Sequence, residues 1–198
     1  MAGTATNVTA GKPKPAGAIF SAPLGTTAPN SAVATLNTAF KDLGYVSQDG
    51  VTRGMSKSTS TVREWGGGAV LVTEDEKTAT VKLKLIEYLN TDVQKFVHGS
   101  DNVTGTLAEG IHIGINDKDT EEHVIVIDQI MKGGIPQRMV INRGVITEIG
   151  DTVFKSNDTV AYDLTILAMI PAGGGNKIDE YIGGAPEGAT GATGATGA

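Results

Sequence analysis

The chain has 198 residues, a mass of 20.4 kDa, a formal net charge of −6 and no cysteine. This length predicts one globular domain with residues to spare for terminal arms. The lack of cysteine excludes a disulfide framework, a thiolate nucleophile and Cys-ligated metal sites. A pI near 5.0 disfavours tight binding of nucleic acid, because phosphates attract cationic surfaces. The sequence shows no signal peptide and no apolar run of about 18 residues, so we expect an unexported chain without membrane contact.

The aliphatic composition favours strands over helices. Val and Ile total 33 against 10 Leu, and 24 Thr add further β-branched side chains. With 27 Gly and an aromatic content of only 5%, many tight turns and a thin core are expected. These values predict an all-β sandwich or barrel of about eight strands, with one or two short helices and extended terminal arms.

In chain order, residues 1–17 come first and lack any periodicity, so they are predicted to be an N-terminal arm without structure of its own. Asn30 or Ser31 can then cap a helix that runs to Leu43, because apolar residues recur at helical spacing and Gly44 follows as a stop. Residues 53–68 are polar and end in three glycines, which indicates an extended excursion between strands. Long connections of this kind are usually functional or disordered.

The strand signals follow. Residues 78–85 alternate apolar and polar side chains, which predicts one buried and one solvated face. Residues 123–127 and 164–170 are apolar at nearly every position, which indicates central or covered strands. Residues 137–149 are interrupted at Arg143 and Gly144, where we expect a hairpin or a bulge.

Two weaker signals complete the survey. Residues 91–97 predict a second short helix that ends at Gly99. The strict Gly-Ala-Thr repeat near the C-terminus predicts a flexible tail, because four triplets cannot hold a collagen-like triple helix. The expected organisation is therefore an arm over residues 1–17, one β-domain over residues 18–175 and a tail over residues 176–198.

A search for catalytic and metal-binding patterns finds none. The three histidines lack a second ligand at a recognised spacing. Residues 116–122 resemble a calcium loop but lack its Gly and its closing Glu, and the glycine triplets precede no Lys-Ser or Lys-Thr pair. We expect a protein without enzymatic activity, cofactor or metal, although two distant carboxylates such as Glu87 and Asp128 can still converge in space.

The charge is uneven along the chain. Residues 1–68 hold six Lys/Arg against three Asp/Glu, whereas residues 69–198 hold ten against nineteen. This division fits either an ordinary solvated surface or a molecule whose opposite ends associate head to tail.

Several segments occur in a recognisable order. They are residues 22–26 (APLGT), 40–51 (FKDLGYVSQDGV), 64–67 (EWGG), 85–87 (LIE), 148–151 (EIGD) and the closing strand at 161–170. Over roughly residues 18–175 the chain thereby resembles the major tail tube proteins of long-tailed, non-contractile bacteriophages.

This resemblance implies a β-sandwich subunit that forms hexameric rings, which stack head to tail into a hollow tube for DNA ejection into the host. It implies a virion tail protein, assembled in the host cytoplasm, with a tape-measure protein and a tail terminator as further partners. Double-stranded DNA would pass through without specific binding. The N-terminal arm would become ordered on assembly, and residues 53–68 would be an inter-subunit stacking loop.

Two sets of residues follow from the resemblance. The candidates for the inter-subunit interface are Lys12, Lys14, Arg53, Lys57, Arg63, Glu64 and Trp65. The candidates for an acidic lumen, which would not retain a polyanion, are Asp117, Asp119, Asp128 and Asp163. Alternatively, residues 53–68 are a mobile hairpin whose Trp65 covers its own core.

A different reading of the fold signals is a ligand- or carbohydrate-binding β-sandwich that does not polymerise. A sugar platform usually needs exposed aromatic side chains, and Trp65 is the only tryptophan. Electron microscopy of the purified protein separates the two readings.

Overall fold

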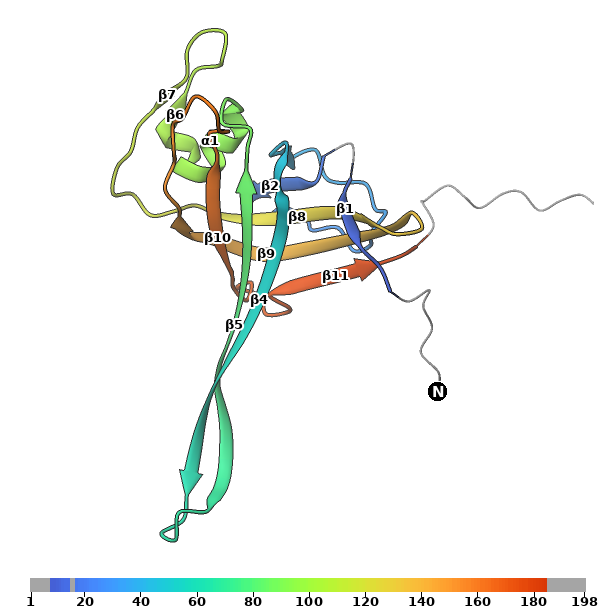
Figure 1. Cartoon of the computed structure of the whole chain (residues 1–198), viewed down its shortest axis with the longest axis vertical. Helices are drawn as coiled ribbons and strands as arrows, with labels where there is room; N and C mark the ends of the chain where they lie inside the picture. Colours follow the sequence, from blue (N-terminus) through green and yellow to red (C-terminus); the bar gives the residue numbers. More distant parts are fainter. Residues whose placement is uncertain (1–7, 15–16, 185–198) are drawn as a thin grey trace, which may run out of the picture.

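A computed structural model describes residues 8–14 and 17–184 (Figure 1). The strands are β1 (Gly11–Pro13), β2 (Ile19–Pro23), β3 (Lys41–Asp42), β4 (Val46–Arg63), β5 (Ala69–Leu85), β6 (Val103–Thr104), β7 (His112–Ile113), β8 (Glu122–Met131), β9 (Ile135–Ile149), β10 (Tyr162–Ala168) and β11 (Ile178–Ile182). One α-helix, α1 (Thr91–His98), and a 3₁₀ turn, η2 (Ser100–Asn102), complete the described part. The all-β prediction is confirmed.

Nine strands form one antiparallel sheet in the order β3-β2-β8-β9-β10-β5-β4, with β1 added to β8 and β11 added to β9. On one edge of β8, β2 and β1 lie end to end; on the far edge of β9, β10 and β11 do the same. The sheet folds over itself, so that β4, β5 and β10 cross the β8–β9 layer (Figure 1). The strands β6 and β7 form a separate small ribbon.

The main core lies between the two layers. The alternation predicted for residues 78–85 is confirmed, because Ala79, Val81, Leu83 and Leu85 are all buried on β5. The neighbouring strand β10, which pairs with β5, buries every second side chain, and α1 closes one end with Val93, Phe96 and Val97. Each fully buried aliphatic side chain of this kind stabilises the fold by roughly 1.5–3 kcal/mol.

A second, smaller core lies behind β8. Ile125 and Ile127 face the main core, whereas Val124 and Val126 face the second one. This explains why the strand is apolar on both faces, as the sequence indicated. The strand β10 is also central, between β9 and β5, but its other face stays open to solvent at Asp163.

The helix expected over residues 30–43 does not form. The Ser31 hydroxyl accepts a hydrogen bond from the Ala34 amide at 3.0 Å, as an N-cap would, yet the chain continues as bends and turns. The carbonyls of Ser31 and Ala34, which a helix would use for its own amides, instead accept hydrogen bonds from Nη1 of Arg138. A buried guanidinium on β9 thus takes the acceptors that helix propagation needs.

The apolar residues that suggested this helix serve two different cores. Phe40 packs behind β8 and Leu43 packs between the layers. Between them, β3 pairs with β2 through Phe20 and Ser21. The spacing therefore belongs to a chain that crosses from one core to the other, and not to one helical face.

The second helix prediction is confirmed by α1. The Asn90 side chain accepts a hydrogen bond from the Asp92 amide at 3.0 Å and caps the first turn. Gly99 ends the helix with a φ of 89°, a conformation that side chains other than glycine rarely adopt. Asp92 in the first turn and Lys95 in the last turn complement the helix dipole.

The interruption at Arg143 and Gly144 is a bulge within one continuous strand. Gly144 lies opposite His123, but Ile125 lies opposite Ile141, so β9 holds one extra residue at this point. The bulge bends β9, whose N-terminal half pairs with β11 and whose C-terminal half pairs with β10.

Both terminal segments are more ordered than expected. The arm was predicted to lack structure, yet β1 pairs with residues 129–131 of β8. The tail was predicted to begin at residue 176, yet β11 pairs with residues 137–141 of β9. Each segment only adds to an existing sheet edge and is held mainly by backbone pairing. Neither therefore needs the alternating apolar pattern by which a strand is recognised in a sequence. Residues 1–7, 15–16 and 185–198 of the predicted arm and tail lie outside the described residues.

Candidate assembly interface

The most prominent surface feature is the outer half of the β4–β5 hairpin, which leaves the body of the molecule (Figure 1). Every residue from 55 to 77 is exposed, whereas the inner half of β5 lines the main core. At about 3.3 Å per residue, the stretch from Met55 to Arg63 spans roughly 30 Å. We call residues 55–77 the projecting hairpin. The expected loop at residues 53–68 is thus mostly regular strand.

The projecting hairpin is held by its own backbone pairing. The register runs from Met55 opposite Ala79 to Arg63 opposite Ala69, with shifts that leave Asp75 and Val70 as extra residues on β5. Such bulges increase the right-handed twist of a ribbon. At the tip, the Glu64 amide donates to the Gly68 carbonyl at 2.9 Å and closes a short loop.

Charged side chains of the projecting hairpin pair with one another. Glu74 accepts from Lys57 at 3.2 Å and contacts Lys77 at 2.5 Å. The hydrogen bond from Lys77, followed by that from Lys57, lowers the pKa of Glu74. The positive charge that the sequence places on residues 53–68 is therefore offset, because residues 53–77 contain four Lys/Arg and four Asp/Glu.

Apolar side chains lie on both faces of the projecting hairpin. Val62 and Leu71 are directly opposed on one face, with exposed fractions of 52% and 54%, and Val72 lies opposite Thr61 on the other face. Trp65 stands fully exposed at the tip. The alternative in which Trp65 covers its own core is therefore wrong. A two-stranded ribbon is at best marginally stable alone, so this arrangement favours a partner that covers it.

The remaining interface candidates lie on the body. Arg53 donates to Glu180 of β11 at 2.6 Å, and Lys14 donates to Asp128 at 3.4 Å. Lys12 is exposed on β1. Of the seven candidates, the structure thus brings Lys57, Arg63, Glu64 and Trp65 together on the projecting hairpin and places the other three elsewhere.

Asp128 does not fit the lumen role expected of it. Its side chain is 3% exposed and accepts from Nε and Nη2 of Arg138 at 2.6 and 2.8 Å. It is a buried counter-ion inside the subunit, so it cannot line a channel. Asp117, Asp119 and Asp163 are exposed, the first two in the loop before β8 and the third on β10, and their lumen role stays a prediction.

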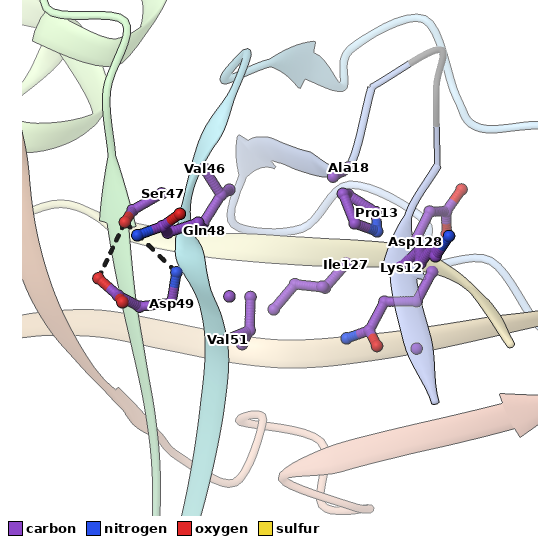
Figure 2. A pocket seen from close by; sticks show the side chains of 13 residues that line it. Lys12, Pro13, Ala18, Val46, Ser47, Gln48, Asp49, Val51, Ile127 and Asp128 are labelled. Carbon is purple, nitrogen blue, oxygen red and sulfur yellow. Dashed lines mark hydrogen bonds between the residues drawn. The ribbon is translucent and has the colours of Figure 1, made fainter. Parts of the chain in front are cut away.

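A pocket of about 400 Å³ lies where the folded sheet fails to close (Figure 2). β1 contributes Lys12 and Pro13 on one side, the start of β4 contributes Val46–Asp49 on the other, and Ile127 of β8 lies between them. The β4 segment here loops away from β5, with Ser47 donating to Asp49 at 2.9 Å. β1 and the start of β4 are therefore not hydrogen-bonded to each other, and the pocket lies between them.

Carboxylates and histidines were the remaining candidates for a chemical site. Within residues 8–14 and 17–184, no three His, Asp or Glu side chains gather as ligands for a metal ion. Glu87 accepts from the Tyr45 amide and the Asn90 side chain, and Asp128 is held by Arg138, so each carboxylate has structural partners. In the same part of the chain, no helix has the length and apolar character needed to cross a lipid bilayer.

Two comparisons with known proteins gave matches. A family model described as "Phage tail tube protein" matches residues 5–187. A chain in the cryo-EM structure of the anti-feeding prophage (AFP) baseplate, 6-fold symmetrised, is similar in fold with 13% identity and a TM-score of 0.43, covering 85% of this chain and 95% of that one. A comparison with curated protein sequences gave no match.

Proposed function

Because this chain belongs to the phage tail tube protein family, we propose that it polymerises as stacked, hexameric rings into the tube of a long-tailed, non-contractile phage. The tube is the conduit for DNA ejection into the host. On this proposal the protein is structural, has no enzymatic activity and is assembled in the host cytoplasm. A tape-measure protein and a tail terminator are its further partners.

One observation carries the proposal. The projecting hairpin exposes apolar side chains on both faces over 23 residues and ends in a fully exposed Trp65. A soluble monomer gains nothing from such a ribbon, since exposed apolar strands promote association. A contact between this ribbon and a different surface of the next copy is heterologous, and repetition of heterologous contacts gives rings or open filaments.

The charge distribution supports passage of DNA without binding. The chain is acidic overall. An acidic or neutral wall offers few Lys or Arg side chains to displace the counterions of the phosphates, so it does not bind DNA tightly. Asp163 lies on the open face of β10, opposite Lys84 of β5, and stays a candidate for the lumen together with Asp117 and Asp119.

Electron microscopy of the purified protein tests the proposal. Wild-type protein should form tubes or stacked rings in negative stain. Replacing residues 57–77 by an Asn-Gly turn between Ser56 and Thr78, which are opposed in the hairpin, should leave a folded monomer because every residue removed is exposed. Its circular dichroism and urea midpoint should stay close to those of the wild type.

A point variant with a matched control sharpens the result. Replacing Val62 and Leu71 together by Thr keeps β-propensity but removes the apolar pair, and should reduce polymerisation. The control Ser58→Thr changes the same strand without removing apolar surface and should leave polymerisation intact. Wild-type protein that remains as dispersed small particles would contradict the proposal and favour the carbohydrate-binding reading, for which Trp65 is the sole indole platform.

A further inference from the structure

An apolar groove of about 700 Å³ lies at the end of the molecule that holds α1. We call it the apical groove and define it by Glu87, Tyr88, Leu89, Leu107 and Val160. Leu89 and Leu107 are 62% and 61% exposed and line the same depression, so they form an exposed apolar patch. The chain's own side chains thus leave an apolar depression open to solvent.

The walls of the apical groove are held in place from beneath. The ring of Tyr88 stacks on that of Tyr162 at 5.3 Å and meets the edge of Phe154 at 5.8 Å. The Tyr88 carbonyl accepts from the Gln94 side chain of α1, and Gln94 also accepts from the Tyr162 hydroxyl at 2.9 Å. The Tyr88 wall of the groove is therefore held in place, which lowers the entropic cost of binding there.

We propose that the apical groove receives the tip of the projecting hairpin from a second copy of this chain, with the Trp65 indole seated between Leu89 and Leu107. This inference rests on the proposed function and names the surface that accepts the hairpin. The occupant cannot be the chain's own tip, because the projecting hairpin and α1 lie at opposite ends of the molecule (Figure 1). A donor at one end and an acceptor at the other link copies in a row.

The two surfaces match in chemistry. Burying a tryptophan side chain removes about 200 Å² from water, and the apical groove is the apolar surface that offers this. The segments around the groove, residues 86–121 and 150–161, contain nine Asp/Glu and three Lys/Arg. The tip carries one cation and one anion, Arg63 and Glu64, so the match rests mainly on apolar surface, and Arg63 is the group that can face Glu87 of the groove.

The single tryptophan makes the native protein its own probe. On assembly of the wild type, Trp65 emission should shift to shorter wavelength, and quenching by acrylamide should fall severalfold relative to dispersed wild-type subunits, with free tryptophan amide as the solvent-exposed reference. Tubes in which Trp65 is quenched as strongly as in dispersed subunits would overturn the proposal and leave the proposed function standing. A wild type that forms no tubes would instead refute the function itself.

Cross-linking identifies the acceptor, because a chain without cysteine can receive a designed pair. Trp65→Cys with Leu107→Cys should give an oxidation-dependent ladder of multimers on non-reducing gels. The control pair, Trp65→Cys with Ile170→Cys, places the second thiol at a residue that is 51% exposed and should give no ladder. Equal ladders from both pairs, or none from the Leu107 pair in intact tubes, would overturn the proposal.

A variant that does not depend on thiols covers the case in which the cysteine pairs fail to assemble. Leu107→Asp should raise the concentration needed for polymerisation by about tenfold or more, as expected when a central contact is lost. The substitution should leave the subunit folded, because Leu107 is largely exposed. An unchanged critical concentration would count against the groove as the acceptor.

Discussion

Replacing Arg138 by Met tests the ion pair that organises the second core. The guanidinium binds both carboxylate oxygens of Asp128 at 2.6 and 2.8 Å, and its Nη1 donates to the carbonyls of Ala34 and Ser31 at 2.6 and 3.1 Å. The side chains of Arg138 and Asp128 are 2% and 3% exposed. Met keeps most of the side-chain length and removes all four hydrogen bonds.

The expected loss follows from burial. Removing one partner of a buried ion pair costs about 3–5 kcal/mol, because the other charge stays buried without its counter-ion. Lys14, 3.4 Å from Asp128 and 46% exposed, compensates in part, so we place the loss near the lower limit, at about 3 kcal/mol. With a urea slope of about 2 kcal/mol/M, the unfolding midpoint should fall by about 1.5 M.

Urea denaturation of the truncated, non-polymerising subunit measures this change. The matched control is Arg143→Met, because Arg143 also binds a carboxylate through two hydrogen bonds, at 2.7 and 2.8 Å to Glu122. Its side chain and that of Glu122 are 30% and 27% exposed, so solvent screens the pair and the midpoint should fall much less. Equal losses for the two variants, or a loss below about 1 kcal/mol for Arg138→Met, would refute the reasoning from burial.

Two further predictions concern the sheet interior. Gly144→Ala should destabilise the subunit by about 1–3 kcal/mol, because a Cβ there would lie 3.0–3.2 Å from three isoleucine side chains. The control Gly173→Ala places its Cβ in open space and should be nearly neutral. Urea unfolding midpoints measure both variants, and equal midpoints would contradict the packing argument. Burial lowers the pKa of His123 below 6.5, so folding disfavours its protonated form; stability should be full above about pH 6.5 and fall as the pH drops below it. His123→Leu should flatten this fall between pH 7 and 5, and an unchanged slope would exclude His123 as its source.

Much of the fold could be predicted from local patterns. The alternation on β5, the doubly apolar β8 and the capped helix α1 each follow from side-chain spacing within a few residues. The helix over residues 30–43 was wrong because its carbonyls bind Arg138, about a hundred residues later in the chain. Such a contact is invisible to local spacing.

The projecting hairpin could be predicted only in part. Trp65 and the length of its segment indicated residues 53–68 as a candidate contact surface. These signals did not include β5, which supplies the exposed Val70, Leu71 and Val72. A signal was available in residues 69–73 (AVLVT), a run rich in strand-forming residues directly after the three glycines. The burial of Asp128 could not be predicted, since its partner is set by strand register between β8 and β9.

The strands β4 and β5 form both the projecting hairpin and one side of the main core, so a mechanical force on the hairpin acts directly on the core. The hairpin exits the body at Gly54 and Thr80 without an interruption in pairing, so there is no hinge at its base. A pull along β5 reaches its seven paired positions on β10 at once, and antiparallel hydrogen bonds, which run across the strands, resist such a pull in shear. Tension applied at Trp65 is thereby transmitted along β5 into the main core.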